Sequence, residues 1–217
     1  GFTFQNCNTD DQIVHDPHHT YYRFGAVGLI SGAHLYTVKI KNCIFANNTG
    51  ITAAGLYLFN VSKVILESCV FVNNSITTGT PAYGYFGTAI FSDQSAAHCG
   101  SGMTVFGSVF YNNESNNSSY PGGTICNWGG GNLSHPERSK NRILNCTFYS
   151  NTAVSGNASC IIRKDDDTYK MDIQNSIFYN NTGTSLINCD SNIDDVVSFN
   201  NNITTDPKFL DETDRKS

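Results

Sequence analysis

The sequence predicts an all-β protein, a single-stranded right-handed parallel β-helix of about seven coils with long loop insertions. Two observations lead to this fold class: one short pattern is repeated along the chain, and its copies are unevenly spaced. The first complete copy is VKIKNCIFANN at residues 38–48. Further copies lie at 64–74, 103–113, 141–151 and 171–181, with a looser copy around 196–202 and a partial one at 2–7. Repetition at this scale indicates a repeat architecture.

The spacing of the copies distinguishes between repeat architectures. The equivalent positions that we align are Cys7, Cys43, Cys69, Ser108, Cys146, Ser176 and Val197, with intervals of 36, 26, 39, 38, 30 and 21 residues. Helical repeats keep a stricter period than this. A parallel β-helix accepts the irregularity because its strands stack at roughly 4.8 Å while the turns between them lengthen outward.

Each copy predicts two short strands that meet at a bend. In the first copy, Val38 and Ile40 point inward, Asn42 forms the corner, and Cys43 and Phe45 continue the inward pattern in a new phase. A third strand per coil is expected to begin at a Gly or another small residue. Its members are residues 25–27, 55–59, 87–91, 123–126, 158–161 and 185–187.

When the copies are aligned, equivalent residues form columns that should run from coil to coil. An aromatic column, expected to stack inside the helix, contains Phe45, Phe71, Phe110, Phe148, Phe178 and Phe199. An asparagine ladder, expected to bond from coil to coil, contains Asn48, Asn74, Asn113, Asn151, Asn181 and Asn202. A second, interrupted ladder at the corner contains Asn6, Asn42, Asn145 and Asn175.

These repeats resemble a known pattern. The Phe-x-x-Asn motifs, such as Phe45 to Asn48 and Phe178 to Asn181, are similar to repeats of chlamydial polymorphic outer-membrane proteins and related surface β-helices. The segment 202–210 (NITTDPKFL) is similar to the exit of pectate-lyase-like right-handed β-helices. The resemblance implies the fold and leaves the function open, because that superfamily includes lyases, hydrolases, adhesins and structural rods.

Composition limits the class of protein. The chain has 217 residues, enough for one elongated domain spanning 1–217, and we expect it to be a processed product or an excerpt of a longer assembly. Its net charge is −5 with only 14% charged residues, and its Lys and Arg are scattered, which argues against a nucleic-acid surface. No apolar run reaches the length of a membrane span.

Asn-x-Ser/Thr sequons indicate an extracellular glycoprotein, secreted or at the cell surface. The chain contains eleven of them. We expect Asn47, Asn73 and Asn180 to carry glycans because they precede the ladder by one residue and point outward. Asn113 and Asn202 should be buried and bare. The remaining proposed glycan sites are Asn60, Asn117, Asn132 and Asn157.

The eight cysteines favour disulfides in such a chain. Cys126 and Cys160 are aligned on adjacent predicted coils, within disulfide range, and Cys43 and Cys69 form a second candidate pair. A buried stack of free thiols, continuous with Ser108 and Ser176, is the alternative interpretation.

The sequence offers one weak candidate for catalysis. Hydrolysis of acidic glycans needs a carboxylate pair. The candidate catalytic residues are Arg163 and the carboxylates of Asp165, Asp166, Asp167 and Asp190. We align Asp93 and Asp190 three coils apart, roughly 14 Å at the strand spacing, which is too far for hydrolysis. No metal site or cofactor is predicted.

Two functions therefore remain at this point. We favour a non-enzymatic extracellular glycoprotein that serves as a structural rod or filament subunit, or as an adhesive surface module. Head-to-tail self-association is its expected partner interaction, because a bare β-helix end presents unpaired backbone. The alternative is a polysaccharide lyase or glycoside hydrolase that acts on acidic glycans.

Overall fold

The chain folds into parallel sheets whose strands recur in a fixed order. A computed structural model describes residues 1–7, 27–31, 37–59, 63–77, 86–93, 102–119, 122–128, 141–154, 158–164, 171–189 and 197–206. All regular elements in these ranges are β-strands. They form four sheets, which we number 1 to 4 in the order in which the chain passes through them after residue 37.

Sheet 1 contains β3 (Thr37–Lys41), β7 (Lys63–Glu67), β11 (Gly102–Phe106), β15 (Arg142–Leu144), β19 (Met171–Gln174) and β22 (Val197–Asn200). Sheet 2 contains β1 (Thr3–Gln5), β4 (Ile44–Ala46), β8 (Val70–Val72), β12 (Val109–Tyr111), β16 (Thr147–Tyr149) and β20 (Ile177–Tyr179). Sheet 3 contains β5 (Thr49–Gly50), β9 (Ser75–Ile76), β13 (Glu114–Ser115) and β17 (Thr152–Ala153). Sheet 4 contains β2 (Gly28–Ser31), β6 (Leu56–Phe59), β10 (Phe86–Asp93), β14 (Gly122–Trp128), β18 (Ala158–Lys164) and β21 (Ser185–Cys189).

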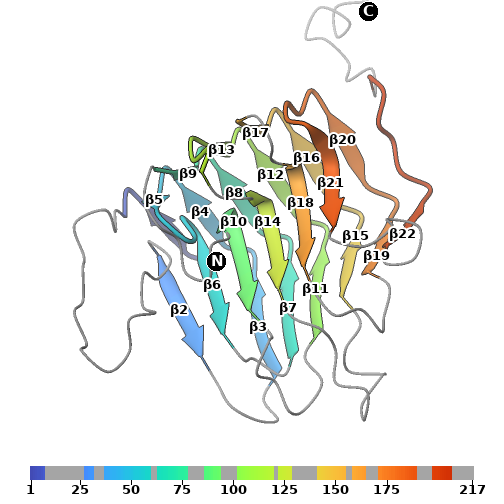
Figure 1. Ribbon diagram of the computed structural model, residues 1–217. Helices are drawn as coiled ribbons and strands as arrows, with labels where there is room; N and C mark the ends of the chain where they lie inside the picture. Colours follow the sequence, from blue (N-terminus) through green and yellow to red (C-terminus); the bar gives the residue numbers. More distant parts are fainter. Residues whose placement is uncertain are drawn as a thin grey trace, which may run out of the picture.

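Consecutive strands lie in different sheets, and each strand pairs with its equivalent one repeat away. Thus β4 pairs with β8, β8 with β12 and β12 with β16, all parallel and with Phe opposite Phe. Figure 1 shows the strands of each sheet side by side in the order of the chain. This arrangement is all-β and compatible with a parallel β-helix, as the repeat predicted.

Two corners of each coil need a left-handed backbone. The first corner joins sheet 1 to sheet 2, and the second corner joins sheet 2 to sheet 3. Asn and Gly occupy ten of these twelve corner positions because they adopt positive φ at low cost, and Ser68 and Ser150 occupy the other two. The first corner contains Asn42, Ser68, Gly107, Asn145, Asn175 and Asn201, with φ between 52° and 57°. The second contains Asn6, Asn47, Asn73, Asn112, Ser150 and Asn180, with φ between 51° and 58°.

A phenylalanine column fills the interior along sheet 2. Its members are Phe4, Phe45, Phe71, Phe110, Phe148 and Phe178. Adjacent rings are stacked, with centroids 4.6 to 5.2 Å apart. Five of the six are fully buried, and Phe4 at the first coil is 38% exposed. The aromatic column predicted from the repeat is therefore confirmed from Phe45 to Phe178.

The predicted register was wrong for the first and last copies. Phe4 pairs with Phe45, and the Cys7 N–H bonds Asn48 Oδ1, so Cys7 occupies the ladder position instead of the Cys43 position. At the other end, Phe199 pairs with Ile173 in sheet 1 and only contacts Phe178 with a tilted ring. Each of these copies lacks part of the pattern. The sequence therefore assigned Phe4 and Phe199 to the wrong strand of the coil.

Sheet 4 corresponds to the predicted third strand, whereas sheet 3 was not predicted. The Gly or small-residue starts fall within or next to β6, β10, β14, β18 and β21. Tyr57 and Phe91 stack on each other on the face of sheet 4 opposite Leu56 and Ile90, and both rings are buried. Both faces of this sheet are thus covered. The strands of sheet 3 have only two residues each, too short to produce a visible alternation.

Candidate functional site

An inner asparagine ladder runs through the coils at the start of sheet 3. It contains Asn48, Asn74, Asn113, Asn151 and Asn181. At Asn113, Nδ2 donates to Phe71 O at 3.0 Å and to Asn151 Oδ1 at 2.9 Å, while Oδ1 accepts from the N–H and the Nδ2 of Asn74. The side-chain amide therefore uses all four of its bonding positions. The predicted ladder is confirmed for these five residues.

Asn202, placed in the same ladder from the sequence, belongs to another column. Its Oδ1 accepts from Ser176 N at 2.8 Å, and its Nδ2 donates to Ile173 O at 2.9 Å. Asn202 is half-buried and sits one coil beyond Ser176. Its assignment to the inner ladder is therefore wrong, for the same reason that Phe199 was misplaced.

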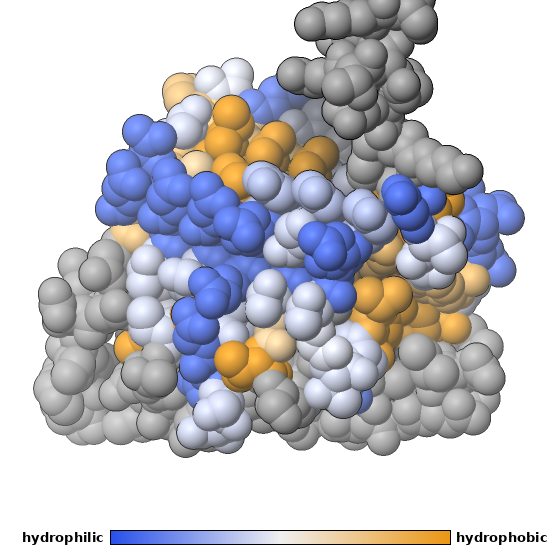
Figure 2. Space-filling view, turned by 90° about the horizontal axis from the view of Figure 1, so that it is seen from above, coloured by the Kyte–Doolittle hydropathy of each residue, from blue (hydrophilic) through white to orange (hydrophobic). Residues whose placement is uncertain are grey.

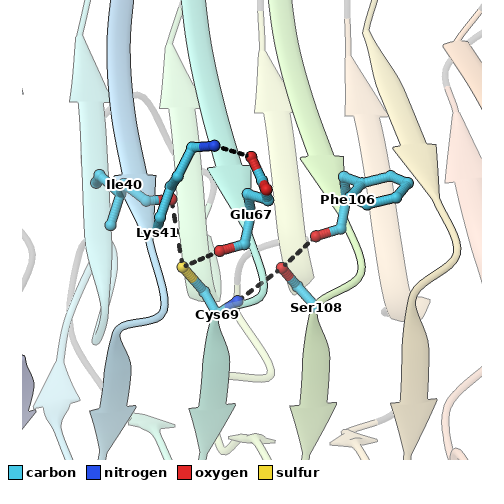
Figure 3. Close-up of polar contacts among 6 residues, drawn as sticks. All are labelled: Ile40, Lys41, Glu67, Cys69, Phe106 and Ser108. Atoms are coloured by element: carbon cyan, nitrogen blue, oxygen red, sulfur yellow. Dashed lines mark hydrogen bonds and ion pairs between the residues drawn. The ribbon is translucent and has the colours of Figure 1, made fainter. Parts of the chain in front are cut away.

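A thiol and hydroxyl column follows the first corner. It contains Cys43, Cys69, Ser108, Cys146 and Ser176, all buried. Each Sγ or Oγ donates to the carbonyl two residues earlier, at 2.9 to 3.5 Å. Figure 3 shows Cys69 Sγ at the carbonyls of Ile40 and Glu67, with the Ser108 hydroxyl accepting the Cys69 N–H. Lys41 and Glu67 form an ion pair on the outer side of the same corner.

Burial favours the protonated form of two thiols in this column, Cys69 and Cys146. Desolvation raises the pKa of Cys69, and it raises the pKa of Cys146 from 9.0 to about 11 against the opposing effect of backbone hydrogen bonds. A thiolate is the reactive form of cysteine, so Cys146 is inert at neutral pH. The column is structural.

Neither predicted disulfide is present. Cys43, Cys69, Cys126 and Cys160 are all free thiols. Cys126 pairs with Ile162, so it is two residues out of register with Cys160, and the expected alignment was wrong. Cys43 and Cys69 do lie on adjacent coils, but their Sγ atoms point to backbone carbonyls. The alternative interpretation, a buried stack of free thiols continuous with serine, is the one observed.

The second corner carries an outer row of amides. Asn73 Nδ2 donates to Asn47 Oδ1 at 3.1 Å, and Asn112 Nδ2 donates to Asn73 Oδ1 at 2.9 Å. Asn180 Nδ2 donates to Ser150 Oγ at 2.9 Å. These bonds are all exposed, so Asn47, Asn73 and Asn180 point outward as expected. Hydrophilic residues form a continuous band across the coils in Figure 2.

The other sequons differ in their surroundings. Asn117 is only 2% exposed, and its Oδ1 accepts from Ser119 N within its own sequon, which argues against a glycan at this site. Asn113 is fully buried, as expected for a ladder member. The sequons at Asn60, Asn132 and Asn157 lie outside the described residues.

Of the five candidates for glycan cleavage, only Arg163 lies within the described residues. Asp165, Asp166, Asp167 and Asp190 lie outside them. The backbone of Arg163 pairs with Asn127 and Cys189 in sheet 4, whereas Asp93 pairs with Phe59 and Trp128. Lys164, and not Arg163, is the residue aligned with Asp93 through Trp128.

Sheet 2 presents an uncharged outer face. None of its six strands contains a charged residue. Tyr111, Tyr149 and Tyr179 stack along this face with centroids 5.3 and 5.7 Å apart, and Tyr111 is 41% exposed. The sequence signal for this row is the Phe-Tyr dipeptide in three consecutive copies of the repeat.

An apolar pocket opens at the first coil. Its volume is about 500 Å³, and it is lined mainly by apolar side chains, with two lysines. The lining residues are Gly1, Phe2, Phe4, Val27, Lys39, Ile40, Lys41, Cys43, Phe45 and Leu56. Phe2 is 76% exposed beside it. The pocket thus exposes one end of the phenylalanine column.

Comparison with known proteins adds no relationship: no family model, curated protein or solved structure matches the chain. Within the described ranges, no helix is long and apolar enough to cross a membrane. The same ranges contain no group of three or more His, Cys, Asp or Glu side chains placed to hold a metal ion.

Proposed function

We propose that this chain is a non-enzymatic extracellular glycoprotein whose single right-handed β-helix of about seven coils acts as a rigid structural rod or adhesive surface module. The observation that carries the proposal is the inner asparagine ladder, in which a central amide such as that of Asn113 is bonded to the coils on both sides. Such a continuous polar ladder stiffens the stack, because bending it would leave buried amides unpaired. A right-handed path is the strongly preferred crossover between parallel strands.

Two surface features support an assembly role. The exposed Asn47, Asn73 and Asn180 supply outward attachment points for glycans. The pocket at the first coil, together with the exposed Phe2, offers an apolar surface for a second coil stack. The edge strands β1, β2 and β3 add to such a surface by parallel pairing with a second stack. We therefore propose head-to-tail self-association as the partner interaction, which gives an open filament.

Negative-stain electron microscopy of the glycosylated protein tests the proposal. Filaments with a subunit repeat of roughly 35 Å, seven coils at the strand spacing, are the expected result. Phe2→Asp is the matched variant, since it places a charge beside the pocket without touching the buried column, and it should leave only short rods. Separate rods for the unmodified chain at all concentrations would contradict self-association. Turnover of a uronate polymer, lost in Asp166→Ala, would instead support the lyase or hydrolase alternative.

A further inference from the structure

Three proposed glycan sites lie on the second corner, and two of them are neighbours in space. Asn47 and Asn73 are 26 residues apart in the chain but occupy adjacent coils, since β4 pairs with β8 directly before them. Their side chains run parallel, with Asn73 Nδ2 donating to Asn47 Oδ1 at 3.1 Å. The sequon hydroxyls are stacked as well, with Thr49 Oγ1 and Ser75 Oγ 3.3 Å apart. The two sequons therefore have the same arrangement and lie one strand spacing apart.

That spacing is too small for two N-linked sugars that leave in the same direction. Stacked strands are about 4.8 Å apart, and a pyranose ring with its acetamido and hydroxymethyl groups is wider than this. Glycosylation also replaces one hydrogen of the Nδ2 amide. Two attached sugars would therefore force the side chains to diverge and break the bond between Asn73 and Asn47.

Asn180 is not subject to this conflict. The residue beside it on the preceding coil is Ser150, which accepts its Nδ2 hydrogen bond and cannot carry an N-linked glycan. On the far side of Asn73, the neighbour Asn112 is followed by Asn113 and Glu114 and is not a sequon. Among the three outward sequons on this corner, Asn47 and Asn73 are the only adjacent pair.

From this geometry we propose that Asn47 and Asn73 are mutually exclusive glycan sites: a folded molecule carries a sugar on one or the other, while Asn180 is occupied independently. The inference rests on the proposed extracellular glycoprotein function. One glycan at this pair leaves the adjacent uncharged face of sheet 2 less covered than two would.

Mass spectrometry of the chain secreted from a eukaryotic host tests the pair. Cleavage at arginine leaves residues 24–138 as one fragment that contains both sites. Enzymatic release of glycans converts each occupied Asn to Asp, so fragmentation of this peptide reports both sites of the same molecule. We expect the doubly converted fraction to fall far below the product of the two single occupancies. A fraction equal to that product would overturn the exclusion.

Two sequon variants supply a matched comparison. Thr49→Val removes the Asn47 sequon but keeps the Asn47 side chain and the shape of residue 49, so occupancy of Asn73 should rise. Thr182→Val removes the Asn180 sequon in the same way and should leave Asn73 occupancy unchanged. An unchanged Asn73 occupancy in Thr49→Val would refute the inference alone. Absence of glycan from every sequon would refute the glycoprotein proposal as well.

Discussion

At the scale of single residues, each column is specified by what its position has to bond. The column after the first corner accepts Cys or Ser because both donate to the carbonyl two residues earlier and both are small. The inner ladder accepts Asn because its side chain has two donors and two acceptor positions in one plane. Cys7 occupies the ladder position at the first coil without an amide side chain, and there its backbone N–H still bonds Asn48 Oδ1.

Replacing Cys146 by serine tests the buried thiol. The serine hydroxyl should bond Leu144 O as Ser176 bonds Gln174 O, so stability at pH 7 should change by only about 1 kcal/mol. The pKa of Cys146 is raised from 9.0 to about 11, so the folded state holds its proton more tightly than the unfolded chain. The stabilisation that this raised pKa gives the folded state is complete below pH 9 and is lost as pH rises toward 11. Over that window wild type should lose about 2 to 3 kcal/mol more than Cys146→Ser, measured by urea unfolding at each pH.

Truncating Asn113 tests the inner ladder. Asn113→Ala leaves the Phe71 carbonyl and the Asn74 amides without their partners in a buried region, so a loss of roughly 3 kcal/mol or more is expected. Asn112→Gly is the control, because it removes one exposed bond and keeps a residue suited to positive φ. Its effect should stay below about 1 kcal/mol in the same thermal or urea unfolding experiment. Equal effects of the two variants would show that the ladder does not stabilise the stack.

At the scale of elements, the strands have only two to eight residues and owe their stability to the coils beside them. Isolated short strands are marginal in water. The corners set the direction of each strand, since a residue at positive φ between β3 and β4 starts the new phase of alternation. Asn, Ser and Gly at the corners and apolar side chains at alternate strand positions therefore act together.

Gly107 offers a test of the corner. It has φ of +57°, and a Cβ placed there would meet only Ser68 Oγ at 3.8 Å, so the space is open. Gly107→Asn should stabilise the protein by about 0.5 kcal/mol, because Asn tolerates this conformation and restricts the unfolded chain. Gly107→Val, of similar size, should destabilise it by about 1 to 2 kcal/mol, because a β-branched residue resists positive φ. Urea midpoints that move in the same direction for both would argue against this account of the corner.

At the scale of the whole molecule, stability depends on columns that cross every coil. The phenylalanine column runs from Phe4 to Phe178 without interruption, so residues far apart in the chain share one core. A defect in a central coil should weaken the contacts of both neighbouring coils. A defect at the first coil should weaken only one side.

Comparing the centre of the column with its end tests this dependence. Phe110→Ala should cost about 3 to 5 kcal/mol, since its fully buried ring stacks on Phe71 and Phe148. Phe4→Ala should cost about 1 kcal/mol, because Phe4 is already 38% exposed and, among the described residues, stacks only on Phe45. Chemical denaturation with a single fluorescence probe measures both. Comparable losses at the two positions would contradict a column with an exposed end.

The amino-acid pattern alone was enough to predict the all-β repeat, the central phenylalanine column and the inner ladder. Complete copies of the pattern carry enough fixed positions to align themselves, because inward side chains must alternate and corners must tolerate positive φ. The partial copies at residues 2–7 and 196–202 lack that information. The alignment expected for each of them therefore differs from the strand pairing in the structure.

Which surface positions become neighbours depends on how the coils stack on one another. Cys126 and Cys160 were expected to align from the sequence, yet Cys126 pairs with Ile162 and is two residues out of register with Cys160. Asn47 and Asn73 become direct partners because two coils stack over a 26-residue interval. Register and side-chain direction arise from pairing between distant strands, and no local pattern in one strand specifies them.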